Sequence, residues 1–520
     1  MYLEYTMAKT SNAQPLFQLI HALTKSEKRS FKLYAGKVSD PTEAKFVQLF
    51  DVLEGMELYN EDQIFKKMPD LKRSQLANLK SHLFKQVLMV LRQSHMKTDV
   101  DIMLRENLDY VRLLFKKGLY EQSMKMLTKT KVTANSYKKN IFKLALLNYE
   151  KNIENQQMLS LDQTTCLKLD KDTKSLLRKI NVAQAFFSLA LRMKAHFLRS
   201  GMARNEDELE KINKIFYANL PEHDKTHLSF SEQYNMCRAY YWFSYITQDF
   251  QSCVKYTEMW VSIFKESNLT HLRHSEFLRG LNRLLQSLFR INDVDRFSIY
   301  YEELLEFEKL YAKAIDSNSK QLMVRCLTVQ TLNKCFLEGD FKNYGAKLER
   351  YLAKLEESIE YIDNNNQLVV FYKSAILYFG LGKYEKSLFY LDRVINNKND
   401  QLREDLKSFA YILYLIVLYD MRDLDQLKTM RNRAFVYLRQ RNILGQFHHI
   451  ILQFLKKTED IMPLDLKGEM ITLRTSLQGL LENKFEAKPL LYFDIMSWLE
   501  SKITSRPFHE VVKELAESKH

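Results

Sequence analysis

The chain has 520 residues, of which only 12 are glycine and 7 are proline, while 46% are apolar and 27% are charged. The shortage of turn-forming glycine and proline argues against a sheet protein, and the apolar share excludes a globally disordered chain. The net charge of +14 comes from basic residues spread along the sequence, so it is weak evidence for an acidic partner.

The five cysteines are odd in number and widely separated, so they predict neither a disulfide framework nor a zinc site. Free thiols are typical of a reducing compartment, and we expect a cytoplasmic protein without a secretory leader. The longest apolar run, residues 409–419, is shorter than the ~20 residues that a membrane span needs. It predicts a buried helix, and we expect no membrane span.

The N-terminal part of the chain differs in pattern from the middle. Residues 1–10 are predicted to be a disordered extension, and residues 11–98 an N-terminal helical bundle or cap. Apolar residues recur there at steps of three and four, which is typical of helices that bury one face. They predict helices at about 15–23, 26–36, 41–58, 61–68 and 71–96, with Thr24 as a plausible cap and Pro41 in a first turn.

Residues 99–460 reuse one unit. A short polar turn, an apolar residue and a helix recur at 117–120, 248–250, 292–294, 338–341, 381–384 and 422–424. Three residues after each apolar turn residue comes the predicted first inward position of a second helix: Ser123, Cys253, Phe297, Tyr344, Ser387 and Leu427. Their spacings are 130, 44, 47, 43 and 40, so two degenerate units are predicted between Thr133 and His227. This period is typical of stacked helical hairpins.

One segment fits a known repeat best. Residues 371–395 carry, in the expected order, Ala375, Tyr378, Gly382, Tyr384, Ser387 and Leu391. Over roughly residues 100–460 the chain therefore resembles the tetratricopeptide-repeat (TPR) superfamily of helical hairpins. The resemblance implies an all-α, right-handed solenoid of about eight hairpins. The period exceeds the family's value of about 34, and the closing proline is missing, so we expect longer helices.

The C-terminal residues 461–520 are predicted to form a helical cap. Both ends of a solenoid need atypical units, because an open end would expose its core. Within the whole sequence we find no motif for a catalytic, metal or nucleotide site. The one close glycine pair, Gly380 and Gly382, lies in a repeat turn, and no histidine pair flanks a glutamate at zinc-binding spacing. We expect no enzyme activity, no cofactor and no metal.

Binding is the function that the repeat pattern favours. First helices of such hairpins line the concave face, and on this sequence they present Arg238 and Trp242, Asn282 and Gln286, Val329 and Asn333, Tyr372 and Ile376, and Ile412 and Ile416. The predicted partner-binding residues are Arg238, Trp242, Asn282, Gln286, Asn333 and Tyr372. Arginine and amides suit a peptide backbone or carboxylate, and aromatic rings suit an anchor. The alternative is that this row packs against a helix or cap, as Ile412 and Ile416 suggest.

The pattern thus predicts a non-enzymatic interaction scaffold that binds a peptide or partner helix. We also expect replacement of Asn282 and Asn333 by alanine to weaken capture of a partner with little loss of stability.

A rival hypothesis concerns DNA binding by a transcriptional regulator. Residues 62–83 have the outline of a helix-turn-helix whose second helix carries Arg73, Gln75, Asn78, Lys80 and His82. Against it, this helix is predicted to continue to about Gln93, and no turn glycine is present. A bundle followed by repeats loosely resembles bacterial repeat sensors, which implies a peptide in the groove and a regulator on the bundle.

Overall fold

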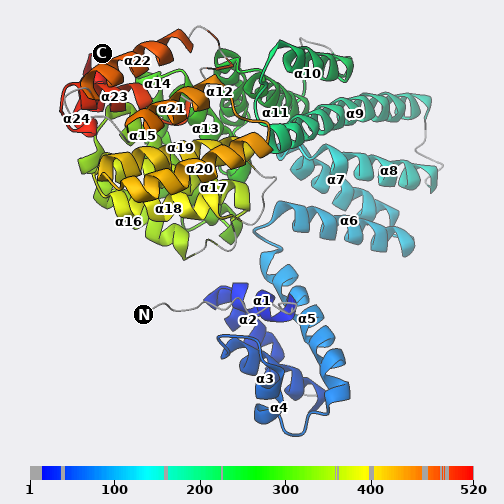
Figure 1. Cartoon of the computed structure of the whole chain (residues 1–520). Coiled ribbons are helices and arrows are strands. Elements are labelled where there is room, and N and C mark those ends of the chain that lie inside the picture. Colours follow the sequence, from blue (N-terminus) through cyan, green and yellow to red (C-terminus); the bar gives the residue numbers. More distant parts are fainter. Residues whose placement is uncertain are drawn as a thin grey trace. The chain divides into compact units, whose positions relative to one another are not determined.

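The computed structural model describes residues 15–36, 41–156, 162–223, 227–357, 359, 362–397, 403–458, 466–480, 483, 485–486 and 491–518. All regular secondary structure in these ranges is helical, which confirms the all-α prediction. The chain divides into two compact units, Met1–Thr173 and Lys174–His520. Figure 1 shows their helices in sequence colours. The predicted extension 1–10 lies outside the described residues.

The first unit begins with five helices that share one hydrophobic core. They are α1 (Pro15–Ala22), α2 (Lys25–Ala35), α3 (Pro41–Glu54), α4 (Glu61–Lys67) and α5 (Arg73–His95). All five follow the predicted ranges closely. The side chain of Thr24 accepts a hydrogen bond from the backbone of Glu27, whose carboxylate accepts one from the backbone of Thr24. This capping box fixes the start of α2, as the sequence suggested.

A second core in the first unit joins α6 (Val100–Lys116), α7 (Tyr120–Ser136) and α8 (Asn140–Gln156). The next helix, α9 (Gln163–Ser200), is 38 residues long and is followed by α10 (Glu206–Ala218). The prediction of two more hairpins between Thr133 and His227 is therefore wrong, because the described residues there hold three helices instead of four. A single long helix takes up the length of a helix, a turn and most of a second helix.

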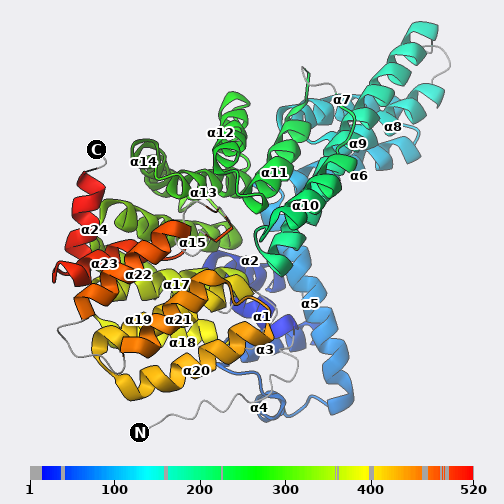
Figure 2. The same ribbon diagram turned by 45° about the horizontal axis from the view of Figure 1, so that its top comes forward.

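The rest of the second unit is a run of consecutive helices (Figures 1 and 2). They are α11 (Phe230–Ile246), α12 (Phe250–Glu266), α13 (His274–Arg290), α14 (Val294–Tyr311), α15 (Ser317–Glu338), α16 (Phe341–Glu356), α17 (Asn364–Gly380), α18 (Tyr384–Ile395), α19 (Glu404–Met421), α20 (Leu424–Gln440), α21 (Gln446–Thr458), α22 (Leu466–Leu480), α23 (Ile495–Ile503) and α24 (Phe508–Glu517). Each helix packs on the next up to α20, and α13, α15, α17 and α19 pack on one another in a row. The arrangement is that of a helical repeat.

The six predicted turns share one backbone conformation. A residue in the left-handed region, with φ between 56° and 73°, stands in each of them: Gly118, Gln248, Asn292, Gly339, Gly382 and Arg422. The backbone N–H of the following residue then bonds back into the preceding helix, as from Asp249 to Ser244. This is the closing bond of a Schellman turn. Glycine occupies this position in three of the six turns and asparagine in one, whereas Gln248 and Arg422 occupy it in the other two, so the turn tolerates several residue types.

The same side-chain contact recurs within separate hairpins. Ser123 and Ser387 donate from their hydroxyls to the carbonyls of Val111 and Ala375, 2.9 and 2.8 Å away, and Cys253 contacts the carbonyl of Tyr241 in the same way. Each acceptor lies 12 residues before its donor. Five of the six predicted inward positions are fully buried, and Tyr344 is half-buried. The repeat register read from the turns is therefore the register of the structure.

The C-terminal helices return to the row of first helices. Helix α24 packs on α15, and a Cβ on Gly339 would lie 2.5 Å from the backbone of Lys513. Only glycine fits this approach. Trp498 on α23 is buried, and its indole N–H donates to Asp420 over 3.2 Å. In the described part of the chain, every helix is too short or too polar to cross a membrane.

Candidate functional site

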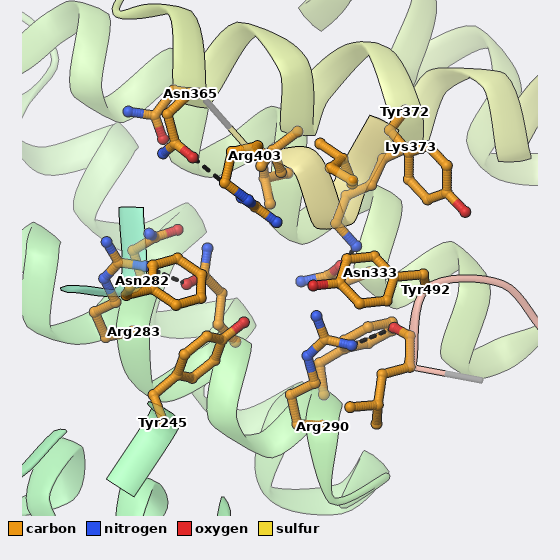
Figure 3. Close-up of a pocket in the computed structure, with 18 of the residues that line it drawn as sticks. Tyr245, Asn282, Arg283, Arg290, Asn333, Asn365, Tyr372, Lys373, Arg403 and Tyr492 are labelled. Atoms are coloured by element: carbon orange, nitrogen blue, oxygen red, sulfur yellow. Dashed lines mark hydrogen bonds between the residues drawn. The ribbon is translucent and has the colours of Figure 1, made fainter. Parts of the chain in front are cut away.

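A pocket of about 1000 Å³, which includes space open to solvent, lies in the second unit. Its walls come from α9, α11, α13, α15, α17, the start of α19 and residues 491–492 (Figure 3). Five of the six residues predicted to bind a partner line it: Trp242, Asn282, Gln286, Asn333 and Tyr372. They come from four successive first helices. The predicted row is thus brought together in space around one concave site.

The sixth predicted residue, Arg238, does not line the pocket. Its guanidinium lies over the rings of Phe187 and Tyr234, at 4.7 and 5.2 Å from their centroids. It also donates a hydrogen bond to Asn235 over 3.0 Å. Arg238 lies on α11 four residues before Trp242, which does line the pocket.

The lining is strongly cationic. It includes Arg283, Arg290, Arg325, Lys373 and Arg403, and none of the described residues that line it is an aspartate or glutamate. In Figure 3, Arg403 and Lys373 approach from one side and Arg290 from the other, toward the same space. The sequence reasoning missed all five. Arg283 and Lys373 directly follow the predicted residues Asn282 and Tyr372, so basic residues beside the row were a usable signal.

A chain of hydrogen bonds runs beneath the pocket. Lys373 donates to Asn333, Asn333 donates to Gln330, and Gln330 donates to Asn282, each over 2.7 Å. Asn282 is 9% exposed and Asn333 is 1% exposed. Buried amides that satisfy one another are costly to remove, because each loss leaves a partner unpaired. The two asparagines are therefore structural, and we now expect their replacement by alanine to cost stability.

Lys373 is held by neutral groups. Its ammonium lies 4.6 Å from the ring centroid of Phe289 and 5.4 Å from that of Phe336. Burial lowers the pKa of Lys373 to about 7, and the nearby Arg290 lowers that pKa in the same direction. A cation in this position is poorly compensated by the protein itself.

The C-terminal segment closes one side of the pocket. Arg290 donates to the carbonyl of Leu491, and the hydroxyl of Tyr492 donates to Asp405 over 2.6 Å. Asp405 also accepts two bonds of 2.9 Å from Arg403. Burial alone would lower the pKa of Arg403, but the carboxylate of Asp405 more than offsets this and raises it. The site is consequently a pocket with a C-terminal wall rather than a trough open along the array.

The remaining positions of the predicted row are buried. Tyr372 is 2% exposed, and its hydroxyl has no hydrogen-bond partner among the described residues. Ile412 and Ile416 lie in a core shared with α21, α22 and α23. The alternative interpretation, that part of the row packs against other helices, thus holds at α19.

The residues of the rival DNA-binding hypothesis lie on α5, in the first unit. Arg73, Gln75, Asn78 and His82 are exposed, whereas Lys80 pairs with Glu61 over 2.5 Å. The amide of Gln75 accepts a bond from the backbone at the helix start. Helix α5 has 23 residues. Because Lys80 already has a carboxylate partner, nothing here favours the hypothesis over an ordinary amphipathic helix, and it stays a prediction.

No protein-family model matches this chain, and no curated protein matches its sequence. Among the described residues, no group of three or more His, Cys, Asp or Glu side chains is arranged to hold a metal ion. Four cysteines are buried, and burial raises the pKa of Cys237 to about 12. The cationic pocket is therefore the candidate site.

Proposed function

We propose that this chain is a cytoplasmic, non-enzymatic binding protein with a right-handed, TPR-like array, and that its pocket captures a peptide or the end of a partner helix. One observation carries the proposal: five residues selected from the repeat pattern as partner-binding line a single pocket. Amides and arginines offer donors to backbone carbonyls and carboxylates, and aromatic side chains offer anchoring surface.

The pocket wall formed by residues 491–492 limits how a partner enters. An extended chain cannot run along all the first helices, because Ile412 and Ile416 are covered. A terminus or a short loop of the partner fits this shape better than a long segment. Recognition of the partner then depends on the cations that line the pocket.

Affinity capture from the native cell, quantified by mass spectrometry, tests the proposal. Arg325→Glu reverses a charge in the pocket lining. The control, Arg350→Glu, reverses a charge at an exposed position of α16. We expect a partner recovered with the unmodified chain and with Arg350→Glu, and at least tenfold less of it with Arg325→Glu. Equal recovery with all three proteins would reject the pocket as the binding site.

A further inference from the structure

Two of the five cations in the pocket have acidic partners. Arg403 forms a bidentate pair with Asp405. Arg325 lies 3.7 Å from Asp363, whose side chain is 61% exposed. These four groups carry no net charge together, so the charge of the pocket comes from the other three cations.

Arg283, Arg290 and Lys373 pair with no carboxylate in the part of the chain that the structure describes. Their hydrogen bonds go to the amide of Gln286, to a backbone carbonyl and to the amide of Asn333. All three side chains are partly buried. Positive charge withdrawn from water without an anion is costly, and a bound anion would remove that cost.

Arg290 and Lys373 are neighbours. Arg290 lowers the pKa of Lys373, so the two cations repel each other across the pocket. Figure 3 shows their nitrogen atoms directed toward the same space, with the hydroxyl of Tyr245 directed there as well. An ammonium, a guanidinium and a hydroxyl offer donors from three directions, which suits a group with several acceptor oxygens.

The number of uncompensated charges selects the chemistry. A carboxylate brings one negative charge, which is fewer than the two permanent charges of Arg283 and Arg290, and Lys373, whose pKa burial lowers to about 7, adds part of a third. A phosphate monoester brings about −1.5 to −2 charges at neutral pH and three acceptor oxygens. We propose that the pocket binds the phosphate group of a small phosphorylated ligand between Arg290 and Lys373, with Arg283 at its edge.

This inference goes beyond capture of a protein partner, because it needs none. It is tested on the purified full chain by titration with inorganic phosphate, followed by calorimetry and by the phosphorus NMR signal, and with acetate at equal ionic strength as the carboxylate probe. We expect saturable binding of phosphate that is tighter than that of acetate. Lys373→Met should weaken phosphate binding at least tenfold. The control Lys428→Met, at an exposed position of α20, should leave phosphate binding unchanged.

Lys373→Met removes a cation without a carboxylate partner, but it also removes the hydrogen bond to Asn333. Arg283→Gln is therefore a second variant, which leaves the hydrogen-bond chain from Lys373 to Asn282 intact. Absence of saturable phosphate binding by the unmodified chain would overturn the proposal. Unchanged affinity in both variants would overturn it too, and tighter binding of acetate would assign the site to a carboxylate instead. None of these results bears on partner capture, which is measured separately.

Discussion

Two equivalent positions in the second unit, Asn333 on α15 and Ile416 on α19, show how one repeat serves two purposes. Both are first-helix positions predicted to face the concave side, and both are at most 1% exposed. Asn333 lies under a cationic pocket, whereas Ile416 lies in a core shared with the C-terminal helices. The repeat pattern sets where a side chain points. Which segment packs over that side chain depends on helices from distant parts of the sequence.

The covered end should be the more sensitive to a polar substitution. Ile416→Asn removes buried apolar surface and leaves an amide without partners, so we expect a loss of about 4 kcal/mol in the free energy of unfolding. Val436 on α20 is 50% exposed, so Val436→Asn should cost less than about 1 kcal/mol. Urea unfolding of both variants measures the difference. Similar losses would mean that α19 is not part of a core.

The two ends also differ in how they should respond to pH. His448 on α21 is buried at the covered end, where its Nδ1 accepts a bond from the backbone of Gly445 and its ring stacks on Phe409. Burial lowers the pKa of His448 to about 4. Because the unfolded chain takes up this proton near pH 6.5, stability should fall as the pH drops from about 6.5 to about 4.

The expected loss from this one group is about 3 kcal/mol, in addition to the losses from carboxylates. His448→Phe should remove that part of the pH dependence, which urea unfolding at pH 7 and pH 4.5 measures. An unchanged pH dependence would show that the ring is accessible to water when folded.

A substitution in the hydrogen-bonded amides beneath the pocket should lower the free energy of unfolding by an intermediate amount. Asn333→Ala removes the donor to the side-chain oxygen of Gln330 and the acceptor for the ammonium of Lys373, so we expect a loss of about 2 kcal/mol. Gln286→Ala removes a half-buried amide of the same pocket outside that chain and should cost less than about 1 kcal/mol. Thermal unfolding compares the two. Equal, small losses would show that Asn333 is free for a ligand, as the sequence alone suggested.

The sequence was informative where structure is local. The turn residues and the inward positions, such as Ser387, are set by contacts within one hairpin, and their register is confirmed. The 38-residue α9 could not be foreseen, because a long amphipathic helix and two short ones share the same periodicity.

The site was accessible from the sequence only in part. Helix periodicity predicted that Asn282 and Asn333 lie on the same side of successive first helices, and both residues border the pocket. The wall at Tyr492 depends on a contact with Asp405, which lies 87 positions earlier in the sequence. The pairing of Arg403 with Asp405 depends on a local backbone geometry that no periodicity encodes. Long-range closure is therefore what separated a predicted groove from the observed pocket.

The smallest effect is expected at Arg325, which lines the pocket. Arg325 reaches an exposed Asp363 over 3.7 Å, and such a pair contributes little once water and salt screen it. Arg325→Gln should therefore change the free energy of unfolding by less than about 0.5 kcal/mol in denaturant titrations. A small change would establish that pocket cations can be altered without disturbing the array, so that any loss of partner capture reports recognition. A loss above about 1.5 kcal/mol would instead make Arg325 structural, and the boundary between supporting and binding residues would have to be drawn nearer the mouth.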